Sequence, residues 1–185
     1  MAGRTFVTLF SGINVGGNRM VAMADLRSML EELGFERVST YLQSGNAVFR
    51  CGRGLAGRSA AIEQEFSRRF GFVSRVMVHD TAWLKRVVAE NPYAEAAGDP
   101  KKLHAYALER APDEDDVSRL AGRNSGSERF HIMGDVLYLF TPDGYGRSKL
   151  AAALPKTLGI ACTARNWRTV LKLLSMAEAA DGPAA

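Results

Sequence analysis

The chain has 185 residues, of which 46% are hydrophobic and 24% are charged, as is typical of a globular protein with one domain or two small subdomains. No apolar run reaches the roughly 20 residues of a membrane-spanning helix, and the N-terminus lacks the features of a secretion signal. We therefore expect a cytoplasmic protein that does not bind a membrane. The net charge of +4 is too small to indicate nucleic-acid binding by itself.

The cysteine and histidine patterns predict neither a disulfide nor a metal centre. Cys51 and Cys162 lie far apart and form no C-x-x-C pair, so we expect two free thiols. His79, His104 and His131 do not have the spacing of metal ligands. No motif indicates a cofactor.

The first part of the chain predicts the element order β-α-β-β-α-β. Strands are expected at residues 4–10, 37–43, 47–50 and 73–78, and helices at residues 23–33 and 55–70. The two middle strands meet at Ser44-Gly45-Asn46, where the glycine and the asparagine tolerate the positive φ of a tight hairpin. This order is that of the ferredoxin-like fold.

The remaining chain predicts the same order again. A connecting helix capped by Asp80 or Thr81 and a linker lead to strands at residues 103–108, 130–133, 136–140 and 160–163. The helices begin at Pro112, near Ser148 and after Asn166, and Pro155 should kink or restart the second of them. The fold class is therefore α+β, with two ferredoxin-like subdomains at residues 1–80 and 101–164, a connection at 81–100 and a C-terminal helix at 165–180.

Two polar loops of the first subdomain should share one end of its sheet. In this fold the first two strands are parallel, so the loop after the first strand lies beside the hairpin after the second. Candidate ligand-binding residues there are Asn14, Gly16, Gly17, Gln43, Ser44 and Asn46. The glycine loop lacks the G-x-G-x-x-G and Walker patterns, and its side chains could equally tie the two loops together.

Two basic loops of the second subdomain form a stronger candidate for an anion site. Residues 145–176 contain six basic residues and no acidic one. The segments 144–149 and 165–169 should share one sheet end, each at the start of a helix, where backbone N–H groups favour anions. The candidates are Tyr145, Arg147, Ser148, Lys149, Arg165, Asn166, Trp167 and Arg168.

These motifs resemble a mostly bacterial family catalogued as domain of unknown function sixteen ninety-seven. The resemblance is carried by GINVGG at residues 12–17, YLQSGNAVF at 41–49, DPKKLH at 99–104, GYGRSK at 144–149 and RNWRTVLK at 165–172. Leu42 and Asp143 depart mildly from the residues that are common in the family. The family has no established activity, so the resemblance implies no catalytic residue.

The leading hypothesis from the sequence is a binding module for a phosphorylated or nucleotide-like anion at helix N-termini. Binding of single-stranded nucleic acid is an alternative, although the strand at residues 46–50 lacks the glycine-aromatic pattern of such sheets. A small enzyme that uses Tyr145, Lys149 or His104, and a purely structural protein, are further alternatives. The oligomeric state does not follow from the sequence.

Overall fold

A computed structural model describes residues 3–52, 57–123 and 126–182. The chain divides into two compact units, which are described separately. Unit 1 comprises residues 1–85 and 172–185, and unit 2 comprises residues 86–171. No helix among the described residues is long and apolar enough to span a membrane.

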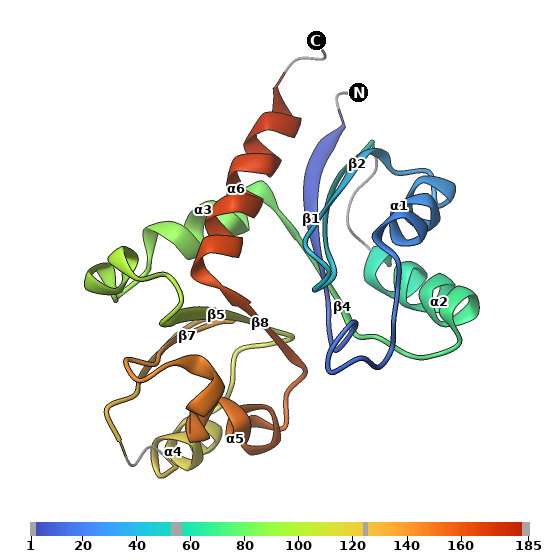
Figure 1. The fold of residues 1–185 in the computed structure, drawn as a ribbon. Helices are drawn as coiled ribbons and strands as arrows, with labels where there is room; N and C mark the ends of the chain where they lie inside the picture. Colours follow the sequence, from blue (N-terminus) through green and yellow to red (C-terminus); the bar gives the residue numbers. More distant parts are fainter. Residues whose placement is uncertain (1–2, 53–56, 124–125, 183–185) are drawn as a thin grey trace. The chain divides into compact units, whose positions relative to one another are not determined.

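Unit 1 contains a four-stranded antiparallel sheet with two helices. Its elements are β1 (Arg4–Phe10), α1 (Met23–Glu32), β2 (Glu36–Tyr41), β3 (Asn46–Cys51), α2 (Arg58–Phe70) and β4 (Val76–Asp80). The strand order is β2-β3-β1-β4, as in the ferredoxin-like fold (Figure 1). The predicted fold of this subdomain is confirmed. β4 lies at Val76–Asp80 and not at the expected 73–78, and the expected start of α2 at residues 55–56 lies outside the described residues.

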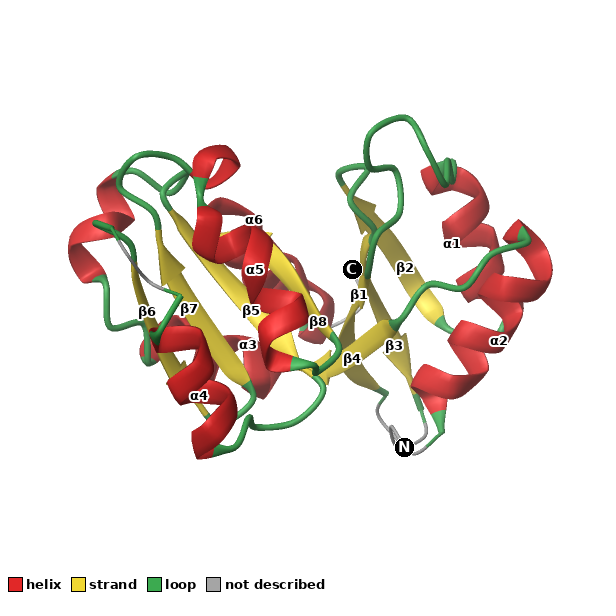
Figure 2. Ribbon diagram, turned by 90° about the horizontal axis from the view of Figure 1, so that it is seen from below, coloured by secondary structure: helices red, strands yellow, loops and turns green. Residues whose placement is uncertain are grey.

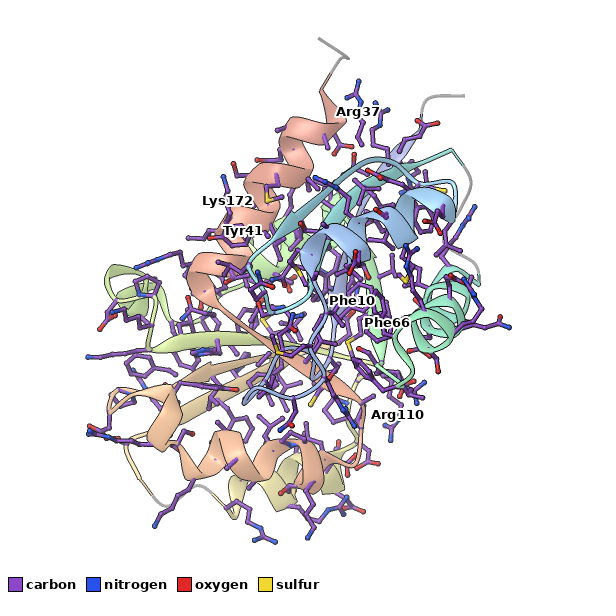
Figure 3. All side chains as sticks on the ribbon, turned by 45° about the vertical axis from the view of Figure 1, so that its right-hand side comes forward. Phe10, Arg37, Tyr41, Phe66, Arg110 and Lys172 are labelled. Carbon is purple, nitrogen blue, oxygen red and sulfur yellow. The ribbon has the colours of Figure 1, made fainter. Side chains whose placement is uncertain are left out.

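The core of unit 1 lies between the sheet and its two helices. Phe10 from β1 contacts Phe66 from α2, with ring centroids 5.2 Å apart (Figure 3). Leu26 and Leu30 of α1 are fully buried in the same cluster. The four-residue spacing of such side chains places them on one helix face, and that face packs on the sheet.

The β2–β3 turn differs from the prediction. Gly45 has positive φ as expected, but Asn46 is the first residue of β3 and is fully buried. The other positive φ in the turn belongs to Leu42, at +56°. The tight turn therefore begins earlier than the polar residues indicated, because Asn46 is used to pair with β1 and β2.

Unit 2 repeats the architecture of unit 1, again as predicted. Its elements are β5 (Leu103–Leu108), α4 (Glu114–Ala121), β6 (Arg129–Met133), β7 (Val136–Phe140), α5 (Lys149–Leu158) and β8 (Cys162–Asn166). The strand order is β6-β7-β5-β8, and α4 and α5 pack on one face of this sheet (Figure 2). Leu120, Leu150 and Leu154 fill the space between the helices and the sheet.

Helices α3 (Thr81–Ala89) and α6 (Trp167–Asp181) extend from one unit into the other along the chain. A short 3₁₀ helix, Ala94–Gly98, lies in the expected linker. Asp80 caps α3, because its Oδ1 accepts a hydrogen bond from the Trp83 N–H at 2.9 Å.

Two details of unit 2 correct the sequence-based expectations. β8 runs from Cys162 to Asn166, whereas the prediction ended this strand at residue 163. Arg165 therefore belongs to a strand and not to a helix start. α5 is not interrupted at Pro155 and runs on to Leu158, although this residue has no N–H to donate to the Ala151 carbonyl.

Candidate functional site

Three loops of unit 1 meet at the end of β1. The Phe10 N–H donates to the Gly45 carbonyl at 2.8 Å, and the Ser11 N–H donates to the Arg75 carbonyl at 2.9 Å. In Figure 1 the blue loop after β1 and the green segment before β4 meet at the lower end of that strand. We call residues 11–22, 42–45 and 71–75 the loop cluster. The expected proximity of the glycine loop and the hairpin is confirmed.

Asn14 joins two segments of the loop cluster. Its Nδ2 donates to the Gln43 carbonyl at 2.7 Å and to the Val21 carbonyl at 3.0 Å, while its Oδ1 accepts from the Val21 N–H at 2.7 Å. Asn14 itself has φ of +54°, a conformation that asparagine tolerates better than most residues. The side chain therefore serves the loop structure and leaves little hydrogen-bonding capacity for a ligand.

We predict that Asn14→Gly lowers the free energy of unfolding by about 1–2 kcal/mol, because buried backbone groups of Val21 lose their partners. Glycine accepts the positive φ, so the loss reports the hydrogen bonds and not backbone strain. Hydrogen exchange should show faster exchange of the Val21 amide. An unchanged exchange rate at Val21 would contradict the role assigned to Asn14.

The other candidates in unit 1 differ in accessibility. Asn46 is buried, and its Nδ2 donates to the Tyr41 carbonyl at 2.8 Å and to the Ser44 Oγ at 3.0 Å. Gly16 and Gly17 form the exposed tip of a small hairpin, and both have positive φ. The side chain of Gln43 is exposed. Among these candidates, the tip, Gln43 and Ser44 are therefore placed to meet a ligand directly.

Aromatic and polar side chains from two predicted motifs meet inside unit 2. The His104 ring stacks on Tyr145 with centroids 3.7 Å apart, and the hydroxyls of Tyr145 and Tyr106 are 2.6 Å apart. Burial lowers the pKa of His104 to about 4 and, with the neighbouring Tyr145, raises the pKa of Tyr106. All three groups are therefore neutral at pH 7. His104 was not among the predicted binding residues, although it is the last residue of the DPKKLH motif and was named for the enzyme alternative.

The residues of the predicted 165–169 segment are largely used within the fold. Arg165 is buried, and its guanidinium donates to the Thr163 Oγ1 at 2.7 Å and to the Ala164 carbonyl at 2.8 Å. Burial lowers the pKa of Arg165 to about 10. Asn166 donates to the Pro100 carbonyl, and Trp167 is buried. Arg168 remains exposed on the first turn of α6.

The start of α5 already holds an anionic group of the protein. Ser148 caps the helix by accepting from the Ala151 N–H at 2.8 Å. A carboxylate oxygen of Glu128 accepts from the Leu150 N–H at 3.2 Å. Arg147 and Lys149 are exposed and line a cavity of about 240 Å³ beside Glu128. Two backbone N–H groups at this helix start, those of Leu150 and Ala151, therefore already donate to side chains of the protein and are not free for an anionic ligand.

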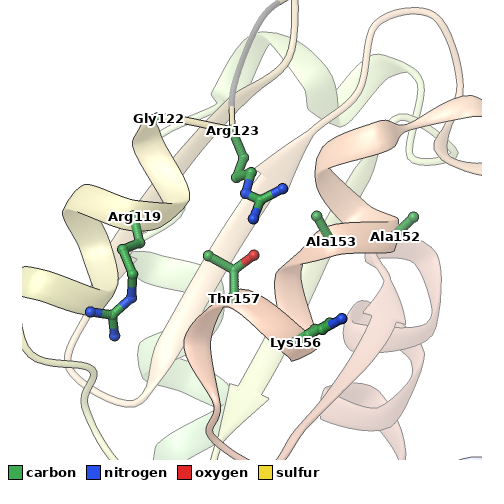
Figure 4. Close-up of a pocket in the computed structure, with 7 residues that line it drawn as sticks. All are labelled: Arg119, Gly122, Arg123, Ala152, Ala153, Lys156 and Thr157. Carbon is green, nitrogen blue, oxygen red and sulfur yellow. The ribbon is translucent and has the colours of Figure 1, made fainter.

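A larger cavity lies between α4 and α5. It has a volume of about 520 Å³ and is lined by Arg119, Gly122, Arg123, Ala152, Ala153, Lys156 and Thr157. We call it the α4–α5 groove. In Figure 4 the Arg123 side chain extends toward α5, and Thr157 faces it across the groove. The groove therefore combines cations, a hydroxyl and a small apolar wall.

The charges of the groove are only partly neutralised by the protein. Arg119 forms an ion pair with the buried Asp116. Among the described residues, no carboxylate lies within ion-pair distance of Arg123 or Lys156. The sequence signal for this site was the four-residue spacing of Arg119, on α4, and Arg123, just after the end of that helix. Only the packing of α4 against α5 shows that Lys156 joins them.

Three comparisons with known proteins complete this description. No curated protein matches the chain. The solved structure of the conserved bacterial protein SP0830 from Streptococcus pneumoniae has a TM-score of 0.75 and 23% identity, and the match covers 96% of this chain and 99% of that one. This similarity supports the fold alone. Residues 4–138 match the family model described as "Protein of unknown function (DUF1697)". This match spans more than half of the chain and includes the motifs at residues 12–17, 41–49 and 99–104, so the chain belongs to that family.

Proposed function

We propose that unit 2 binds a phosphorylated or nucleotide-like anion in the α4–α5 groove. The observation that carries the proposal is the pair Arg123, just after the end of α4, and Lys156, on α5. Both cations line one cavity, and neither has a carboxylate partner among the described residues. Cations in one concave site attract an anion and concentrate it locally. Arg119 lies at the edge of the same groove.

The chemistry of the groove suits a phosphate group attached to an organic body. The planar guanidinium of Arg123 can donate two parallel hydrogen bonds to phosphate oxygens, while the ammonium of Lys156 supplies a point charge. Thr157 offers a hydroxyl donor, and Ala152 and Ala153 offer an apolar wall for a ring. A volume of about 520 Å³ is within the range of small-molecule sites.

The start of α5 is a less suitable anion site than the sequence indicated. Glu128 places its own carboxylate against the Leu150 N–H, so a phosphate there would meet a like charge. Arg165 is buried within the fold. Arg147, Lys149 and Arg168 remain exposed cations, and the site predicted at residues 144–149 and 165–169 is therefore kept as the competing location in the experiment.

Base stacking on the sheets receives no support from the burial pattern. Sheets that bind single-stranded RNA present aromatic rings on their central strands. Here five rings of the central strands are buried: Phe6, Phe10, Phe49, Tyr106 and Tyr138. The sixth, Phe140 at the end of β7, is partly buried and packs against Tyr93 and Arg129. We therefore favour a small phosphorylated ligand over a single-stranded nucleic acid.

The test is calorimetric titration of the full chain with AMP, ATP and inorganic phosphate, with adenosine as the uncharged control. The double variant Arg123→Glu/Lys156→Glu should weaken binding by more than about tenfold, because two charge-assisted contacts become repulsive. The matched variants are Arg147→Glu/Lys149→Glu at the start of α5 and Lys172→Glu, which leaves both cavities unchanged.

Three outcomes would overturn the proposal. The first is that no phosphate compound binds. The second is that the groove variant binds as well as the unmodified chain. The third is that only the Arg147→Glu/Lys149→Glu variant loses affinity, which would return the site to the loop predicted from the sequence. A loss confined to the groove variant, with adenosine inactive, supports the proposal.

A further inference from the structure

The loop cluster of unit 1 exposes an unusual concentration of large apolar side chains. Val15, Met20, Leu42 and Val73 are 66%, 68%, 54% and 69% exposed. They are four of the five exposed large hydrophobic residues in the described part of the chain; the fifth is Leu171, on α6. Scattered apolar side chains are normal on a protein surface, but a group of four on three adjoining loops indicates an interaction site.

The backbone of the loop cluster is held in conformations that cost free energy. Four non-glycine residues of the described chain have positive φ, and three of them, Asn14, Arg19 and Leu42, belong to this cluster. Leu42 is the clearest case, since glycine or asparagine would suit its φ of +56° better and its side chain gains no burial. Strain that brings no packing is typical of residues that serve binding.

The loop cluster is also positively charged. Its three segments contain Arg19 and Arg75 and no aspartate or glutamate. Arg75 pairs with Glu63, whereas the Arg19 guanidinium lies over the Phe72 ring, 5.6 Å from its centroid. Among the described residues, no carboxylate is within ion-pair distance of Arg19. This contact with Phe72 places the cation beside Val73.

We propose that the loop cluster docks a segment of a partner protein that carries apolar side chains next to carboxylates. The apolar side chains would cover Val15, Met20 and Leu42, and a carboxylate would pair with Arg19. A symmetric contact between two copies of this chain fits less well, because it would bring one Arg19 toward the other. A membrane surface also fits less well, since one unpaired arginine adds only about 1 kcal/mol of attraction to anionic lipids.

The test uses NMR spectra of the full, ¹⁵N-labelled chain with three synthetic twelve-residue peptides. Each contains four leucines, and the polar positions are all glutamate, all lysine or all glutamine. The glutamate peptide should shift the amides of residues 15–20, 42–44 and 73, with at least about fivefold higher affinity than the glutamine peptide. The lysine peptide should leave these amides unchanged.

Variants separate docking from folding. Leu42→Asn suits the backbone and should keep the fold while reducing the affinity for the glutamate peptide by about fivefold. Leu171→Ser removes another exposed apolar side chain, outside the cluster, and should leave that affinity unchanged. Arg19→Glu should reverse the preference, so that the lysine peptide binds better than the glutamate peptide.

Several results would overturn this proposal. They are equal shifts with all three peptides, shifts outside the loop cluster, unchanged binding by Leu42→Asn, and binding to phosphatidylglycerol vesicles in place of the glutamate peptide. If the chain forms oligomers without peptide, and variants of these residues abolish them, the loop cluster would instead mediate self-association. None of these results bears on the α4–α5 groove.

Discussion

Gly45→Ala is expected to lower the free energy of unfolding of unit 1 by about 3 kcal/mol. A Cβ atom at this position would lie 2.7 Å from the Ile13 Cδ1 and 2.8 Å from the Phe10 Cβ. Both neighbours are buried, so neither can move without disturbing the core. The φ of +73° adds a cost of about 1 kcal/mol for any L-residue, and overpacking adds about 1–3 kcal/mol.

Gly17→Ala provides the matched control for this prediction. Gly17 has a similar φ of +77°, but an added Cβ would meet nothing within 4 Å. Gly17→Ala should therefore lower the free energy of unfolding only through the strain of the positive φ, by about 1 kcal/mol. Urea denaturation gives the two free energies, and hydrogen exchange by segment shows whether protection is lost in unit 1. Equal costs for the two variants would mean that the close approach at Gly45 relaxes freely.

Acid should destabilise unit 2 through His104. Burial lowers its pKa to about 4 in the folded chain, compared with 6.5 for an exposed histidine. The unfolded chain therefore binds the proton more tightly, so stability is complete above pH 6.5 and falls as the pH decreases toward 4. Near pH 4.5 the loss from this residue is about 2.5 kcal/mol.

His104→Phe removes the titrating group and keeps a ring to stack on Tyr145. The unfolding free energies of the variant and the unmodified chain should agree within about 1 kcal/mol at pH 8, where the histidine is neutral. At pH 4.5 the variant should be more stable by about 2.5 kcal/mol. The measurement is urea denaturation at both pH values, and parallel pH dependence of the two proteins would contradict the assignment.

Local patterns in the sequence were sufficient for most of the fold. The run at residues 4–10 is rich in β-branched and aromatic residues and is stopped by Ser11-Gly12, and β1 has the predicted bounds. The strand at residues 103–108 is likewise confirmed. The ferredoxin-like order then followed from topology, and with it the meeting of the glycine loop and the hairpin.

Features that depend on distant partners were not accessible in this way. β8 extends to Asn166 because Arg165 and Asn166 pair with β5, and a short apolar run could not reveal that register. Glu128 is twenty-two residues before the backbone N–H that it accepts from at the start of α5. Lys156 approaches Arg123 only through the packing of α4 on α5. The predicted ligand-binding residues remain predictions, with Asn14, Asn46 and Arg165 now given internal contacts.

The composition of unit 1 has a consequence for the order of folding on the ribosome. Its last part comes from the end of the chain: the Thr81 hydroxyl donates to Asp181, Lys85 pairs with Glu178, and Arg37 donates to the Ala180 carbonyl. Unit 2 is continuous, so all of its residues emerge before residue 172. Domains usually fold in the order in which they are synthesised, from the N-terminus onward. Here the last residues of unit 1 are synthesised after all of unit 2. Unit 2 can form from one continuous stretch of chain, whereas unit 1 needs residues from both sides of unit 2 in the sequence.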